Sequence, residues 1–172
     1  ATSNLEGLQA NNINLIELDF AHPATLKVQL ADFKETNTRW DYIIHTAGLT
    51  KCNDKKDFDK VNYLGTKNFI EVLTKLNMIP KKFIYLSSLS VFGPIHEKKM
   101  VAISEDDTPK PNTAYGLSKL HAEEYIKDIP DFPYLIYRPT GVYGPREKDY
   151  FMMAQSIQKY IDFAAGFRKQ LL

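Results

Sequence analysis

The chain has 172 residues, of which 44% are hydrophobic and 25% charged, and its formal net charge is +1. This balance is typical of one globular domain and offers no electrostatic basis for binding nucleic acid or an anionic membrane surface. The single cysteine, Cys52, excludes an internal disulfide framework, and with no apparent signal peptide or membrane-spanning run it predicts a cytoplasmic protein.

Four short apolar runs predict β-strands. They are rich in Ile, Tyr and Phe and too short for helices, which is typical of strands buried on both faces of a parallel sheet. In chain order they are "INLIEL" (residues 13–18), "DYIIH" (41–45), "KFIYLS" (82–87) and "PYLIYR" (133–138).

Helical patterns lie between these runs. Pro23, which follows Asp19 in the chain and opens "PATLKVQLADF", is a typical helix start. Two apolar stripes predict further helices, one with Val61, Leu64, Asn68, Phe69, Val72, Leu73 and Leu76, the other with Tyr115, Leu117, Leu120, Ala122, Ile126 and Ile129. Strand and helix in alternation predict an α/β fold with a parallel sheet, and residues 93–112, with three prolines, predict a long surface connection.

Small and polar residues follow three of the predicted strands. The segments read "HTAGLT", "SSLSVFG" and "RPTGVYGP". Ligands of open α/β sheets bind outside the carboxyl ends of the strands, where Gly and Ala allow close backbone approach. Loops after strands are often rich in Gly and Ser for conformational reasons alone, but three such loops in succession favour a cofactor crevice.

A tyrosine and a lysine four residues apart, Tyr115 and Lys119, would share one face of a helix. A neighbouring ammonium favours the phenolate and suits the tyrosine to acid–base chemistry. Tyr63 and Lys67 have the same spacing, so spacing alone does not choose between the pairs.

Five segments in this order resemble the extended short-chain dehydrogenase/reductase superfamily, specifically its NAD(P)-dependent epimerase/dehydratase family. They are "DYIIHTAG", "VNYLGTKNFIEV", "FIYLSSLSVFG", "EDDTPKPNTAYGLSKLHAEEY" and "YRPTGVYGP". The resemblance implies a Rossmann-like parallel sheet flanked by helices. It also selects Tyr115 over Tyr63, because the active tyrosine of this family opens the helix after the "SSxxVYG" strand.

The resemblance implies a role for each matching residue. Tyr115 would exchange a proton with the substrate, Lys119 would assist it and bind the nicotinamide ribose, and Ser88 would hold the substrate oxygen. NAD or NADP would be bound by Asp19, Phe20, His45, Ala47, Gly48, Asn62, Lys119, Pro139 and Thr140, and the substrate would face Ser90, Val142 and Arg146, with no metal.

Several of these residues also have a structural interpretation. Ser88 could merely cap or satisfy a strand end, and Asp19 or Asn62 could cap a helix. His45 is more typical of a structural histidine at a strand end than of a general base, and Arg146 of a surface loop.

The chain departs from the family pattern at both ends. No segment has the glycine-rich turn that holds the pyrophosphate, and we expect the substrate-selecting domain of this family to be missing as well. We therefore expect residues 1–172 to be the central part of a dinucleotide-binding Rossmann domain that lacks its first two strands and is inactive by itself. The strand at 41–45 would then have an unpaired edge, which we expect to be covered by an unusual pairing, a swapped dimer or a partner chain.

The resemblance predicts the function of the parent enzyme. It would be an NAD(P)-dependent oxidoreductase, a reductase or a nucleotide-sugar epimerase, acting on a sugar nucleotide or on a ketone, with a slight preference for the dihydroflavonol-reductase-like branch. The alternative is a non-catalytic NAD(P)-sensing or scaffold protein of the same fold. A homodimer is expected through the helices that run from Asn62 to Leu76 and from Thr113 to Ile129.

Overall fold

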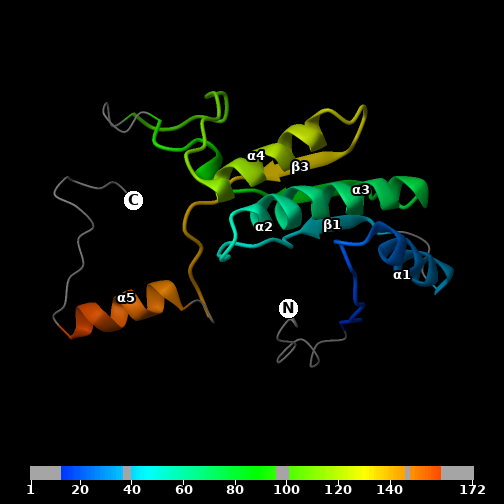
Figure 1. The fold of residues 1–172 in the computed structure, drawn as a ribbon, viewed down its shortest axis with the longest axis horizontal. Helices are drawn as coiled ribbons and strands as arrows, with labels where there is room; N and C mark the ends of the chain where they lie inside the picture. Colours follow the sequence, from blue (N-terminus) through cyan, green and yellow to red (C-terminus); the bar gives the residue numbers. More distant parts are fainter. Residues whose placement is uncertain (1–12, 37–39, 96–100, 146–147, 160–172) are drawn as a thin grey trace. The chain divides into compact units, whose positions relative to one another are not determined.

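The computed structural model describes residues 13–36, 40–95, 101–145 and 148–159, and the chain divides into two units, Ala1–Thr140 and Gly141–Leu172. The first unit holds the sheet and all but one of the labelled helices (Figure 1). Its elements are α1 (Pro23–Thr36), β1 (Tyr42–His45), α2 (Lys56–Phe58), the π-helical turn η1 (Asp59–Leu64), α3 (Gly65–Lys75), β2 (Lys82–Leu86), the 3₁₀ turn η2 (Leu89–Val91), α4 (Ala114–Lys127) and β3 (Tyr134–Tyr137). The second unit holds α5 (Asp149–Gln158).

The three strands form a parallel sheet in the order β1-β2-β3. His45 lies opposite Tyr85, and Leu86 lies opposite Tyr137. The predicted parallel α/β sheet and three of its four predicted strands are therefore confirmed. Because all three strands point the same way, the loops that follow them meet at one edge of the sheet.

The prediction of a strand at residues 13–18 is wrong. These residues have no regular structure, and Ile13, Leu15 and Ile16 are 47%, 44% and 44% exposed. A strand needs a neighbour for its backbone hydrogen bonds, and within the described ranges no segment pairs with residues 13–18 or with the outer edges of β1 and β3. The unusual pairing within the chain is thus not found among these residues, and a swapped dimer or a partner chain stays a prediction.

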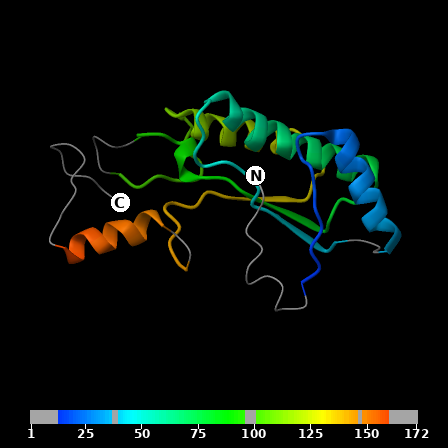
Figure 2. The same ribbon diagram turned by 60° about the horizontal axis from the view of Figure 1, so that its bottom comes forward.

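In the first unit, helices cover one face of the sheet. Figure 2 shows α3 and α4 on the same side of the strands, and α1 packs against α3. Phe83 and Tyr85 of β2 belong to the covered face and are fully buried. The opposite face carries four exposed apolar side chains, Tyr42, Ile44, Leu135 and Tyr137. The expectation of burial on both faces is therefore wrong for these described residues.

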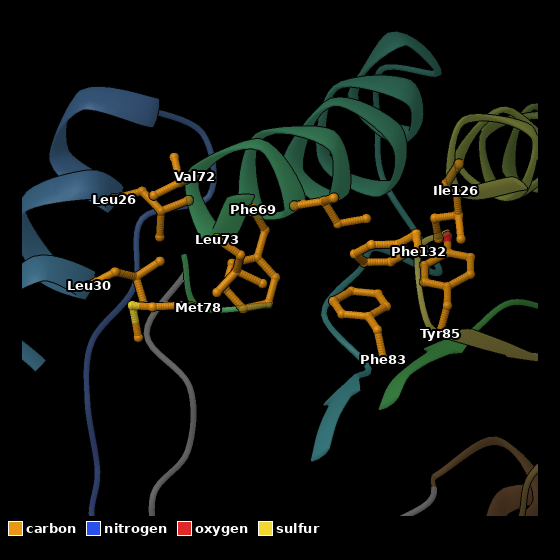
Figure 3. Close-up of a cluster of buried hydrophobic side chains, with 12 residues drawn as sticks. Leu26, Leu30, Phe69, Val72, Leu73, Met78, Phe83, Tyr85, Ile126 and Phe132 are labelled. Carbon is orange, nitrogen blue, oxygen red and sulfur yellow. The ribbon is translucent and has the colours of Figure 1, made fainter. Parts of the chain in front are cut away.

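The hydrophobic core lies between this sheet and its helices (Figure 3). Leu26 and Leu30 of α1 meet the α3 side of the cluster, near Met78. Phe83 and Phe132 contact each other at 5.4 Å between ring centroids, near the β2 and α4 side. Burying each such side chain contributes about 1.5–3 kcal/mol, so this cluster fixes α3 and α4 against the strands.

The predicted helices are confirmed, but two apolar stripes differ in detail. Val61 and Leu64 are 40% and 42% exposed, whereas Asn62 between them is fully buried. The reason is the π-helical geometry of η1, in which one extra residue per turn rotates the face that meets the core. Leu117 on α4 is also exposed, at 44%. In the described residues, the helices are too short or too polar to cross a membrane.

Candidate active site

The first turn of α4 lies against the η2 turn. Thr113 caps α4, and its hydroxyl accepts a hydrogen bond from the Gly116 amide at 3.0 Å. A Cβ atom on Gly116 would stand only 2.4 Å from the carbonyl oxygen of Ser90. Only a glycine allows this backbone approach, and it brings the turn after β2 next to Tyr115.

Ser88 caps the η2 turn. Its Oγ accepts a hydrogen bond from the Ser90 amide at 3.2 Å and lies 3.1 Å from the Ser90 Oγ. The capping interpretation is therefore confirmed, and the half-buried hydroxyl remains at the carboxyl end of β2. The Leu89 amide donates to the Pro139 carbonyl at 3.0 Å, so Ser88, Ser90 and Pro139 lie in adjoining segments.

Lys119 lies one helical turn after Tyr115 and is only 4% exposed. Its Nζ donates to the Leu86 carbonyl at 2.9 Å and lies 5.0 Å from the centre of the Tyr85 ring. Burial lowers the pKa of Lys119 to about 8, against the opposing effect of the Glu123 carboxylate. A buried ammonium at this end of the sheet is the strongest electrostatic feature of the site.

Asn62 links the loop after β1 to α4. Its Oδ1 accepts from the Leu49 amide at 2.7 Å, and its Nδ2 donates to the Leu49 carbonyl and to the Ser118 Oγ, both at 3.0 Å. It lies inside η1 rather than at a helix start, so the capping interpretation is wrong. A Cβ atom on Gly48 would stand 2.8 Å from the Asn62 Oδ1 and 3.2 Å from the Lys119 Nζ. Gly48, Asn62 and Lys119 therefore meet at one point.

The side chain of His45 has a structural role. The ring is 4% exposed and contacts the rings of Phe20 and Phe69 at 5.6 and 5.4 Å between centroids. Its Nε2 lies 3.0 Å from the Thr66 Oγ1, whose own hydrogen goes to the Asn62 carbonyl, so His45 donates from Nε2. Any ligand contact by His45 must come from its backbone.

Asp19 takes part in the turn that precedes α1. Its Oδ1 accepts from the Ala21 amide at 3.0 Å, and its Oδ2 pairs with His22 at 2.8 Å. Phe20 and Ala47 line a hollow of about 300 Å³ beside β1. Because α1 begins only at Pro23, Asp19 stabilises the turn before the helix and the helix-capping interpretation is wrong, while Phe20 and Ala47 border an open space.

Three further residues of the predicted site stand at or after the end of the first unit. Thr140 is exposed at the end of the first unit. Val142 belongs to the second unit, where it is 66% exposed, and Arg146 lies outside the described residues. Among the described side chains, no cluster of His, Cys, Asp or Glu could hold a metal ion.

A buried acidic residue beneath the site was missed from the sequence. Glu123 is fully buried and accepts hydrogen bonds from the Ser87 Oγ at 2.5 Å and from the Arg138 Nη2 at 2.6 Å. The available signal was a glutamate one turn after Lys119 on the face of α4 that also carries buried apolar side chains.

The protein is expected to lose stability as the pH falls below about 6.5 because of His45. Burial, aided by the Lys119 charge, lowers the pKa of His45 to about 4. The unfolded state therefore binds the proton first, and a stabilisation on the order of 3 kcal/mol that is complete above about pH 6.5 is lost toward about pH 4. Urea unfolding as a function of pH measures this loss.

His45→Gln is expected to flatten this part of the pH dependence. His22→Gln is the matched control, because the His22 side chain is 73% exposed. Equal pH dependence in wild type and His45→Gln would contradict the assignment.

Comparison with known families and structures agrees with this geometry. The model of the NAD dependent epimerase/dehydratase family matches residues 1–166. GDP-6-deoxy-D-mannose reductase of Pseudomonas aeruginosa is 30% identical over 139 residues, which cover 77% of this chain and 45% of the reductase. The chain thus spans about half the length of the curated relatives it matches. It covers 45% of this reductase and 47% of GDP-6-deoxy-D-talose 4-dehydrogenase of Aggregatibacter actinomycetemcomitans.

Solved structures show the same fold. RMD from Pseudomonas aeruginosa complexed with NADPH has a TM-score of 0.69 and 28% identity, with coverage of 83% of this chain and 48% of that one. UDP-glucuronic acid 4-epimerase from Bacillus cereus in complex with NAD has a TM-score of 0.69 and 25% identity, with coverage of 91% and 49%.

Proposed function

Since the chain belongs to the NAD-dependent epimerase/dehydratase family, we propose that the protein is an NAD(P)-dependent oxidoreductase that interconverts a secondary alcohol and a ketone. The observation that carries the proposal is the buried Lys119 ammonium one helical turn after Tyr115, beside the Ser88 turn. A non-catalytic sensing or scaffold protein has no need of this set.

The residues around Lys119 fit the nicotinamide end of NAD or NADP. Gly48 leaves room beside the Asn62 amide and the Lys119 ammonium, where a Cβ would be crowded. Lys119 would hydrogen-bond the nicotinamide ribose, and Pro139 would lie near the ring. When bound, the cofactor supplies or accepts the hydride.

Tyr115 and Ser88 would act on the substrate oxygen. Tyr115 transfers its phenolic proton to that oxygen or takes a proton from it, and the Lys119 charge stabilises the phenolate. Ser88 donates a hydrogen bond to the same oxygen by redirecting the hydroxyl that now lies 3.1 Å from the Ser90 Oγ. Both side chains act from rigid elements, since one caps η2 and the other opens α4.

We infer that the substrate is a nucleotide sugar, handled by a reductase or by an epimerase. The support comes from relatives, which include a GDP-6-deoxy-D-mannose reductase and a UDP-glucuronic acid 4-epimerase. A steroid-like ketone has support from one relative, sterol-4-alpha-carboxylate 3-dehydrogenase of Candida albicans, which is 30% identical over 117 residues. A dihydroflavonol-like ketone rests on the sequence resemblance alone.

The experiment is a fluorescence titration with NADH and with NADPH of the protein at the full length of its reading frame, followed by turnover assays with GDP- and UDP-sugars. Saturable binding of one cofactor and sugar-dependent oxidation or reduction support the proposal. Binding without turnover of any sugar nucleotide or ketone favours the sensing protein, and no binding of either cofactor contradicts both.

We further infer a homodimer through the helices that run from Asn62 to Leu76 and from Thr113 to Ile129, whose elements η1 and α4 pack against each other within the protomer. Val61, Leu64 and Leu117 expose apolar side chains on these elements, at 40%, 42% and 44%. Leu117→Glu is expected to halve the mass measured by light scattering, because a buried unpaired carboxylate costs several kcal/mol.

Val28→Glu is the control for the dimer, because Val28 is 61% exposed on α1, away from this surface. A monomeric mass for the wild-type protein would contradict the proposed dimer.

A further inference from the structure

Three elements that carry the proposed site converge on the carboxylate of Glu123. Glu123 itself lies one turn after Lys119 on α4. From the end of β2, the Ser87 Oγ donates to Glu123 Oε1 at 2.5 Å. From the end of β3, Arg138 donates through Nε at 2.9 Å and through Nη2 at 2.6 Å.

The same pair holds both ends of the segment that contains Ser88. Ser87, which is hydrogen-bonded to Glu123, directly precedes Ser88. At the other end of that segment, the Arg138 guanidinium lies 4.7 Å from the centre of the buried Phe92 ring. Ser88 and Ser90 therefore lie between two anchors that both depend on the Glu123–Arg138 pair.

Glu123 is ionised in this environment. Burial alone would raise the pKa of Glu123, but the hydrogen bonds from Arg138 and Ser87 outweigh it and hold the pKa below its usual value. The Glu123 side chain is 0% exposed and the Arg138 side chain 13%. Charge-assisted, two-pronged contacts of this kind fix geometry strongly.

We propose that Glu123 is a positioning residue for the oxidoreductase reaction, which holds the Ser88 turn in register with Tyr115 through Ser87 and Arg138 and supplies the counter-charge for Lys119. The inference rests on the proposed function. It gives Glu123 no contact with substrate or cofactor, because its carboxylate is fully enclosed by protein groups.

The charges around Lys119 determine the sign of the expected effect. The groups that face it are Tyr85 from β2, His45 from β1 and Glu123 from α4. Those that face Glu123 are Arg138, Ser87, Tyr85 and Lys127, and Glu105 faces Arg138. Glu123 raises the pKa of Lys119 against the effect of burial, so removing its charge lowers that pKa and moves any loss of activity at alkaline pH to lower pH.

The test compares Glu123→Gln with Glu124→Gln, which makes the same charge change at the next, exposed position. In the full-length protein, Glu123→Gln is expected to lower kcat by about tenfold or more, as small misplacements of reacting groups do, with little change in the cofactor KM. The alkaline limb of the pH–rate profile is expected about one pH unit lower. Glu124→Gln should match wild type.

Two further measurements keep the test decisive. Glu123→Gln/Arg138→Met removes both buried charges together and is expected to fold while retaining the low kcat. NMR titration of the Lys119 side chain reports its pKa without any turnover.

A wild-type kcat and pH profile in the double variant, or an unchanged Lys119 titration in Glu123→Gln, would overturn the positioning role. If instead the wild-type protein binds no nicotinamide cofactor, the proposed function fails, and the Lys119 titration still decides whether Glu123 sets the charge of that lysine.

Discussion

Replacing Tyr115 with phenylalanine is expected to reduce kcat by about 10²- to 10⁴-fold, the usual contribution of a positioned acid–base group. The substitution removes one hydroxyl and keeps the ring, which contacts Phe58 at 5.8 Å between centroids. Fold and cofactor affinity should therefore stay close to wild type. Steady-state kinetics, with cofactor titration in parallel, measure the two effects separately.

The chain offers its own control for this experiment. Tyr63 has the same spacing to Lys67 that Tyr115 has to Lys119, but its ring lies between His121 and Tyr125 on the helical surface. Tyr63→Phe should retain wild-type kcat. Equal losses in the two variants, or full activity of Tyr115→Phe, would remove Tyr115 from the mechanism.

Arg138→Met is expected to lower the free energy of unfolding by about 3–5 kcal/mol, the usual cost of leaving a buried charge without its partner. Glu123 is fully buried and would lose all three guanidinium hydrogen bonds. Because Arg138 and Ser87 hold the pKa of Glu123 below its usual value, the pair stabilises the protein at neutral pH and loses this effect as the carboxylate is protonated in acid. Urea unfolding at neutral pH measures the cost.

Lys127→Met is the matched control, since Lys127 also contacts Glu123, at 3.4 Å, but from a side chain that is 42% exposed. It should cost less than about 1 kcal/mol, as exposed ion pairs do. Adding Glu123→Gln to Arg138→Met should restore much of the lost stability. An Arg138→Met protein as stable as Lys127→Met would contradict this account.

Local patterns predicted most of the fold because most elements carry their own signals. Pro23 marks the start of α1 as observed, and the capping residue Thr113 immediately precedes the predicted α4. The strand prediction for residues 13–18 is wrong because a strand needs a partner strand, and apolar character alone does not supply one. The predicted burial of Val61 and Leu64 is wrong because nothing in a 3.6-residue period indicates a π-helical turn.

The candidate site was predicted from the family resemblance, because the spacing of tyrosine and lysine alone does not choose between the Tyr115–Lys119 and Tyr63–Lys67 pairs. Ser88, Tyr115 and Lys119 stand in motifs that can be read from the sequence, and the structure places them on adjoining elements. The Glu123–Arg138 pair could not be found so easily. A charged residue on a helix is usually solvated, and the burial of Glu123 depends on its ion pair with Arg138, which lies directly after β3 and 15 residues later in the chain.

The π-helical geometry of η1 has a consequence for insertions and deletions. It carries one more residue than an α-helix would place in the same turn, and that surplus directs Asn62 toward the Leu49 backbone while α3 keeps Phe69 and Leu73 in the core. Deleting Tyr63 or Leu64, which lie between Asn62 and α3, would restore regular helix and rotate Asn62 by about 100° relative to α3. The core is expected to survive such a deletion, but the loop after β1 would lose its hydrogen bonds to Asn62, so the number of residues in this single turn couples helix folding to the position of that loop.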